Sequence, residues 1–145
     1  NLSIAIGYGT LNFLLGWLVT KPIHVAPIHM LVMLSAFDFF ASISKDYRDM
    51  TGDIKYGART IPIVMGRAKA VSFEFTAIYV ILALPLIYYV LAMESNHMIL
   101  LLTPLGSILA YHAHRCVIIG KDVECYKSIM LLYILIRGII IIAYI

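Results

Sequence analysis

The chain has 145 residues, of which 62% are hydrophobic and only 13% are charged. A soluble domain usually carries about 25% charged residues, so this composition excludes an ordinary soluble domain. The formal net charge is only +3. The two cysteines, Cys116 and Cys125, lack the spacing of a zinc site and are interpreted as ordinary thiols.

Five long apolar stretches account for the low charge. They are Leu2–Val19, Pro27–Ile43, Ala70–Ala92, Met98–Tyr111 and Ser128–Ile145. A helix needs about 20 apolar residues, with a range near 17–25, to cross a bilayer. Four of the five stretches meet this requirement. The exception is Met98–Tyr111, which meets it only when it is extended through His112 and His114. The sequence therefore predicts an all-α, polytopic transmembrane helical bundle with five spans.

The first of these stretches begins almost at the first residue. No basic segment precedes Leu2–Val19, so it is not predicted to be a signal peptide. Because Asn1 leads so abruptly into a span, we expect the chain to be a fragment or one half of a larger protein.

Basic residues are concentrated in two of the connections between the stretches. The connection after the second stretch holds Lys45, Arg48, Lys55, Arg59, Arg67 and Lys69, and the connection before the last holds Arg115, Lys121 and Lys127. Lys and Arg accumulate on the cytoplasmic side of membrane proteins, so both connections are predicted to be cytoplasmic. Four of these bases are expected only to set this topology: Arg67, Lys69, Arg115 and Lys121.

Acids accompany the bases in the first of these connections, "SKDYRDMTGDIKYGARTIP" at residues 44–62. Asp46, Asp49 and Asp53 would share one face if the second span continues as a helix. Carboxylates so placed need a cation between them, and Mg²⁺ takes one or two carboxylates together with substrate phosphates. Four bases among these acids are suited to binding phosphate oxygens: Lys45, Arg48, Lys55 and Arg59. The pattern favours a lipid or polyprenyl pyrophosphate as the ligand.

Small residues and a proline punctuate the same segment. Gly52 and Gly57 are predicted to form a turn after the acids, and Pro62 is predicted to end any helix at about Ile61. Transporter loops also mix Asp, Arg and Gly to form turns and local ion pairs. Composition alone therefore leaves a pyrophosphate site and an ordinary polar loop as alternatives.

The stretch "KDYRDMTGDIKYGARTIPIVMG", Lys45–Gly66, resembles the second aspartate-rich segment of the UbiA superfamily of intramembrane prenyltransferases. The acid cluster corresponds to Asp46, Asp49 and Asp53, and the positions that follow it correspond to Gly57, Thr60, Pro62 and Gly66. The resemblance implies that residues 1–145 are the C-terminal portion of one transmembrane prenyltransferase domain. The five spans would be helices five to nine of its nine, and residues 44–69 its cytoplasmic aspartate-rich loop.

The first aspartate-rich segment of that superfamily is not in this sequence. We therefore expect an N-terminal half that carries it, on the same chain or on a second chain. The resemblance further implies that Mg²⁺ held by both segments binds a polyprenyl pyrophosphate. The bond from the prenyl carbon to oxygen breaks, pyrophosphate leaves, and an acceptor attacks the allylic cation that remains.

The resemblance also implies roles for individual residues. The implied catalytic and metal-binding residues are Asp49 and Asp53, followed by Asp46. The implied contacts to pyrophosphate are Lys45, Arg48, Lys55 and Arg59. Asp38 and Tyr8 are candidates for lining the substrate chamber.

The acceptor is less closely specified than the donor. The motif is most similar to that of archaeal members that transfer geranylgeranyl to geranylgeranylglyceryl phosphate in ether-lipid synthesis. An aromatic quinone precursor or a chlorin is the alternative acceptor, and a non-enzymatic transporter or scaffold subunit is the alternative of another class. The expected partners are the pyrophosphate donor, a membrane-soluble acceptor and membrane lipids, with no nucleic acid.

Three charged residues lie within or beside the apolar stretches. Asp38 and Arg137 fall inside spans, where charges usually face a bundle interior or a water-filled cavity. Asp38 is thus either part of a chamber or a structural partner of a donor, and Arg137 is expected to pair with an acid that the sequence does not identify. Glu74 lies near the start of the third stretch, where the helix dipole favours a carboxylate.

Overall fold

A computed structural model of the chain describes residues 7, 10–20, 28–92 and 100–144. The regular elements of this part are all helices. They are α2 (Asn12–Thr20), α3 (Ile28–Ala41), α4 (Ile43–Lys55), α5 (Ile61–Met65), α6 (Arg67–Ala92), α7 (Leu102–Ile118) and α8 (Asp122–Tyr144). The predicted all-α class is therefore confirmed.

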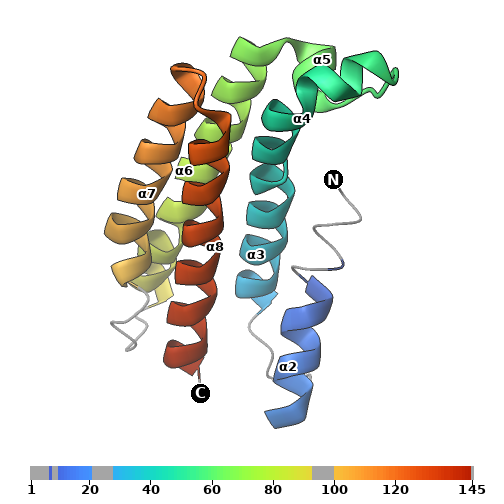
Figure 1. The fold of residues 1–145 in the computed structure, drawn as a ribbon. Coiled ribbons are helices and arrows are strands. Elements are labelled where there is room, and N and C mark those ends of the chain that lie inside the picture. Colours follow the sequence, from blue (N-terminus) through green and yellow to red (C-terminus); the bar gives the residue numbers. More distant parts are fainter. Residues whose placement is uncertain (1–6, 8–9, 21–27, 93–99, 145) are drawn as a thin grey trace.

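The long helices form a bundle in which α3 and α4 together make one of the columns (Figure 1). Helix α7 packs against both α6 and α8, while α3 packs against α6 and α4 packs against α8. The α7–α8 turn, α4 and α5 all lie at the same end of the bundle (Figure 1). The two connections that are rich in basic residues therefore meet at one end of the molecule.

Three helices are long and apolar enough to cross a membrane, judged by length and composition over the described residues. They are Ile28–Lys55, Arg67–Leu91 and Asp122–Ile142. Large apolar side chains are exposed on their outer faces, among them Val80, Ile87 and Ile134. The first predicted span lies partly outside the described residues, and α7 has 17 residues, so the count of five spans stays a prediction.

Several helices extend beyond the apolar stretches that predicted them. Helix α6 begins at Arg67 rather than at Ala70, and α8 begins at Asp122 rather than at Ser128. Asp122 and Glu124 occupy the first turn of α8, where the helix dipole favours acidic side chains. Hydropathy underestimates the length of these helices, because their first residues are polar and lie at the charged end of the bundle.

The core lies where α3, α6, α7 and α8 meet. Its largest fully buried side chains include Phe37, Phe75, Ile78, Leu132 and Ile136. Gly106 of α7 is also buried, and a Cβ atom there would lie 2.6 Å from Cδ2 of Leu82. A residue with no side chain thus lets α7 approach α6 closely, as small residues do between membrane helices.

The turn after the acids differs from the predicted one. Gly52 lies inside α4, which continues to Lys55, so its predicted role in the turn is wrong. Gly57 does form the turn, with a φ of 69° that suits glycine. Pro62 was predicted to end a helix, yet it lies in the first turn of α5. Proline is favoured there because a first-turn N–H has no partner within the helix.

Candidate active site

The acidic segment continues the second predicted span as a helix. The Ser42 amide donates to the Asp38 carbonyl at 3.1 Å, so backbone hydrogen bonding carries across the junction of α3 and α4. Ile43, Ser44 and Tyr47 form the buried side of α4. The acids are left on its other sides, where they are reachable from outside the bundle.

The three aspartates are all partly exposed. The Asp49 carboxylate accepts hydrogen bonds from Arg48, at 2.9 Å from Nε and 3.4 Å from Nη2. Within the described ranges, no three His, Cys, Asp or Glu side chains converge into a group that could hold a metal ion. Asp46, Asp49 and Asp53, called the aspartate face below, therefore do not by themselves form such a group. An open set of carboxylate oxygens fits Mg²⁺, which binds through one or two carboxylates with waters and phosphates.

The four bases beside the aspartate face are all exposed: Lys45, Arg48, Lys55 and Arg59. The Arg48 guanidinium also lies over the ring of Tyr126 in α8, 4.9 Å from its centroid. This contact draws Arg48 towards α8 while it holds Asp49. The arrangement thus presents cationic donors next to the acids, where an anionic ligand can reach both.

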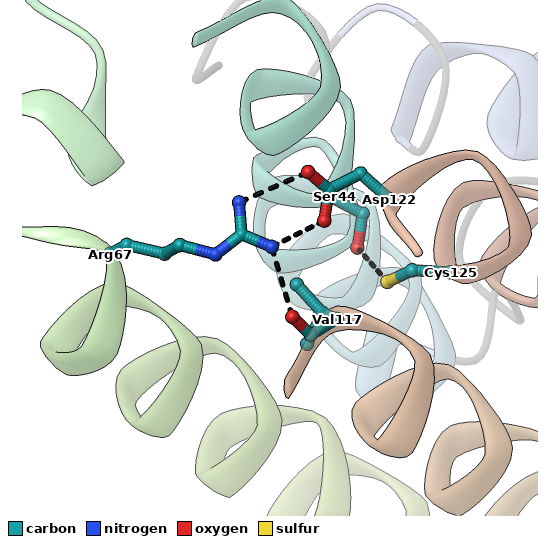
Figure 2. A network of polar contacts seen from close by, with 5 residues as sticks. All are labelled: Ser44, Arg67, Val117, Asp122 and Cys125. Carbon is teal, nitrogen blue, oxygen red and sulfur yellow. Dashed lines mark hydrogen bonds and ion pairs between the residues drawn. The ribbon is translucent and has the colours of Figure 1, made fainter. Parts of the chain in front are cut away.

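Arg67 forms a link between the start of α6 and the α7–α8 turn (Figure 2). Its Nη1 donates to Asp122 Oδ2 at 3.0 Å, and its Nη2 donates both to Asp122 Oδ1 and to the Val117 carbonyl, the latter at 2.9 Å. The expectation that Arg67 only sets topology is therefore wrong. Sequence patterns do not predict this link, because 55 residues separate Arg67 from Asp122.

A second polar contact lies inside the bundle, between α4 and α6. The Ser44 hydroxyl donates to Glu74 Oε1, and neither residue has any solvent-exposed surface. Cys125 Sγ of α8 lies 3.9 Å from Ser44 Oγ and completes the contact (Figure 2). Glu74 was expected at a helix start, but α6 begins at Arg67, two turns earlier. The carboxyl is therefore held by a hydroxyl of α4 rather than by the helix dipole.

The two intramembrane charges pair with each other. Arg137 Nη2 donates to Asp38 Oδ2 at 2.9 Å, which joins α8 to α3. The Arg137 guanidinium also lies 4.2 Å from the centroid of the Tyr133 ring. The expected acidic partner of Arg137 is thus Asp38, and the contact supports a structural role for Asp38. Its role in lining a chamber stays a prediction, and Tyr8 lies outside the described residues.

The chain matches the sequence model of the UbiA prenyltransferase family over residues 1–135. It belongs to the UbiA prenyltransferase family. Membership in this family, together with the three long apolar helices, makes the chain an integral membrane protein. The resemblance found in Lys45–Gly66 is confirmed.

Two curated proteins are similar to the chain, and both are named digeranylgeranylglyceryl phosphate synthase. The protein from Methanosphaera stadtmanae is 37% identical over 94 residues, and the one from Methanothrix thermoacetophila is 37% identical over 90 residues. Each alignment covers 61% of this chain and 32% of the relative. The matched part of the chain therefore corresponds to about a third of each relative's length. No solved structure shows significant similarity to the chain.

Proposed function

We propose that the chain is the C-terminal part of a Mg²⁺-dependent prenyltransferase that acts within the membrane. It would transfer a polyprenyl group from its pyrophosphate to a lipid acceptor, and geranylgeranylglyceryl phosphate is the acceptor we favour. The observation that carries the proposal is the aspartate face of α4, presented at the charged end of an apolar bundle in a UbiA family member. The printed name of the two relatives supports the choice of acceptor.

Residues of α4 and the following turn would bind two parts of the donor complex: the acids bind Mg²⁺ and the bases bind pyrophosphate. Asp46, Asp49 and Asp53 would hold Mg²⁺ together with the pyrophosphate oxygens. When bound, Mg²⁺ neutralises the charge that develops on the departing pyrophosphate. The exposed bases donate charge-assisted hydrogen bonds to the same oxygens. Arg48, which already bonds to Asp49, is placed to join the acidic and the phosphate-binding groups.

The apolar part of the bundle supplies the other requirement of this chemistry. An allylic cation reacts with water, so the chamber that holds it must exclude water. The largest buried side chains of α3, α6 and α8 are hydrophobic, among them Phe37, Phe75 and Ile136. The donor's hydrocarbon chain would lie against apolar surface of the bundle, with its pyrophosphate at the aspartate face.

We propose that an N-terminal portion provides the first aspartate-rich segment, on the same chain or on a second one. The described residues contain no group of three His, Cys, Asp or Glu side chains that could hold a metal ion, and the matched part of the chain corresponds to only 32% of each relative. Carboxylates from that portion would complete the metal ligands. We also propose that this end of the bundle faces the cytoplasm, because the basic connections meet there.

Product formation by the full-length protein in membranes tests the proposed activity. Geranylgeranyl pyrophosphate is supplied with and without Mg²⁺, and the acceptors are geranylgeranylglyceryl phosphate, 4-hydroxybenzoate and dihydroxynaphthoate. Mg²⁺-dependent product with the glyceryl phosphate supports the proposal. Product with an aromatic acceptor alone assigns a quinone pathway. Folded protein that gives no product with any acceptor favours the transporter or scaffold alternative.

Asp49→Asn and Asp53→Asn are expected to lower Mg²⁺-dependent turnover by about 100-fold or more, because each removes charge from the group that stabilises the leaving pyrophosphate. Both side chains are partly exposed, so folding should be unaffected. Released pyrophosphate and prenylated lipid are measured together. Glu124→Gln is the matched control, since this exposed carboxylate lies on α8, outside the aspartate face. Equal activity in all three variants would contradict the assignment.

A further inference from the structure

A fully buried carboxyl lies directly beneath the aspartate face. Glu74 has no exposed surface, and its Oε1 atom accepts the hydrogen bond from Ser44 of α4. Burying a carboxyl in an apolar bundle is costly unless its polar atoms are satisfied. The Tyr47 hydroxyl of α4 also interacts with the Glu74 carboxyl, so a second polar group of α4 meets Glu74 beside Ser44. Packing alone does not account for a polar group kept at this position.

The residues that contact Glu74 and Arg67 come from the helix that carries the aspartates. Ser44 lies two residues before Asp46, and Tyr47 lies between Asp46 and Asp49. In a helix of 3.6 residues per turn, the direction of one side chain fixes the directions of its neighbours. Whatever holds Ser44 and Tyr47 against the bundle therefore also fixes the direction in which the aspartates point.

Arg67 and Cys125 hold α4 from two further directions. The Arg67 guanidinium lies over the Tyr47 ring, 5.3 Å from its centroid. Arg67 is itself bound by Asp122 and the Val117 carbonyl, and Cys125 of α8 contacts Ser44 (Figure 2). The first half of α4, which holds Ser44 and Tyr47, is thus fixed to both α6 and α8.

We propose that Glu74 is a positioning residue for the metal site: through Ser44 it sets the rotation of α4 and so the direction of the aspartate face. Glu74 does not touch the substrate or the metal ion. Its effect reaches them because the aspartates project from the same rigid helix. This inference rests on the function proposed above, since it assumes that the aspartate face binds a divalent cation with pyrophosphate.

The test compares Ser44→Ala, Glu74→Ala and Glu74→Gln in the purified full-length protein. Mn²⁺ binding in the presence of inorganic pyrophosphate is measured by electron paramagnetic resonance, and the Mg²⁺ dependence of turnover is measured separately. We expect Ser44→Ala and Glu74→Ala to weaken Mn²⁺ binding about 10-fold, the effect typical of losing a group that orients metal ligands. Glu74→Gln should keep Mn²⁺ binding close to that of the wild type, because its amide oxygen still accepts the Ser44 hydrogen bond.

Ser128→Ala is the matched control for a lost buried hydroxyl. Ser128 lies on α8, where its hydroxyl donates to the Glu124 carbonyl at 2.9 Å and lies 2.9 Å from His112 Nδ1. Neither partner belongs to α4. We expect this variant to lose thermal stability comparable to that lost by Ser44→Ala, with Mn²⁺ binding unchanged.

The outcomes separate this inference from the proposed function. Variants of Ser44 and Glu74 that lose stability but bind Mn²⁺ as the wild type does would show a merely structural contact and overturn the inference. Wild-type protein that neither binds Mn²⁺ nor forms product would instead overturn the proposed function. Ser44→Ala removes a single hydroxyl from a helix, so it keeps the test decisive even if Glu74→Ala fails to fold.

Discussion

Asp38 and Arg137 form a charge pair between α3 and α8, deep in the bundle. Their side chains are 3% and 20% exposed, so the pair has given up most of its hydration. Desolvation of both charges offsets much of their attraction, and such a pair is weak evidence for stability. The energetic asymmetry is more informative, because removing one partner leaves the other charge buried.

Asp38→Asn is expected to destabilise the protein by about 3–5 kcal/mol, the usual cost of breaking a buried pair from one side. Thermal unfolding in detergent micelles measures the effect. The double variant Asp38→Leu with Arg137→Met should recover most of this loss, since neither charge then remains in the bundle. A double variant as unstable as Asp38→Asn would show that the two positions act through other contacts.

Helices α4, α5 and α6 are joined by short connections that depend on glycine. Gly66 follows α5 directly and has a φ of 80° and a ψ of 143°, a conformation that side-chain-bearing residues rarely adopt. Space is not the constraint, because a Cβ atom at Gly66 would meet nothing within 4 Å. The backbone angle alone therefore requires glycine between α5 and α6, where the chain reaches Arg67.

Gly66→Ala is expected to cost about 1–3 kcal/mol, the strain of a residue held at such angles. Gly52→Ala is the matched control, since it also adds a methyl group in open space but lies within α4. Alanine in a helix should stabilise that variant by about 0.5–1 kcal/mol. Both changes are read from thermal unfolding in detergent, and a similar shift for the two variants would contradict this account of Gly66.

At the scale of the whole molecule, charge is gathered at one end of an otherwise apolar bundle. Helix α4, the start of α6 and the α7–α8 turn converge there (Figure 1), and Arg67 bonds to Asp122 across them. By the positive-inside rule, we propose that this end faces the cytoplasm. The aspartate face would then meet a donor and Mg²⁺ supplied from the cytoplasmic side.

An Arg59→Cys variant of the full-length protein tests this orientation. Arg59 is exposed in the turn between α4 and α5, so a thiol there should be reachable from water. We expect a membrane-impermeant maleimide to label it in inverted vesicles but not in intact cells. Protein with only its native cysteines is the control for background, because Cys116 and Cys125 are buried. Labelling in intact cells would reverse the proposed topology.

The helical class and the aspartate face were both predictable from local pattern. Apolar stretches of sufficient length predict membrane helices, and the spacing of Asp46, Asp49 and Asp53 places them on one face of any helix. The boundaries of the helices at the charged end of the bundle were harder to predict from local pattern. Helix α4 continues through Gly52, and Pro62 lies in the first turn of α5 rather than after a helix. Glycine is tolerated within a helix, and proline suits a first turn because its missing N–H would have no partner there.

The contacts that fix the bundle were decided only by tertiary structure. Asp38 pairs with a residue 99 positions away, Ser44 with one 30 positions away, and Arg67 with one 55 positions away. Helical periodicity relates residues within one helix, but it does not say which helices become neighbours or at what depth. The sequence by itself therefore determined the helices and their acidic face. Packing decided which buried charges meet, because each needs a partner that only a neighbouring helix can bring within reach.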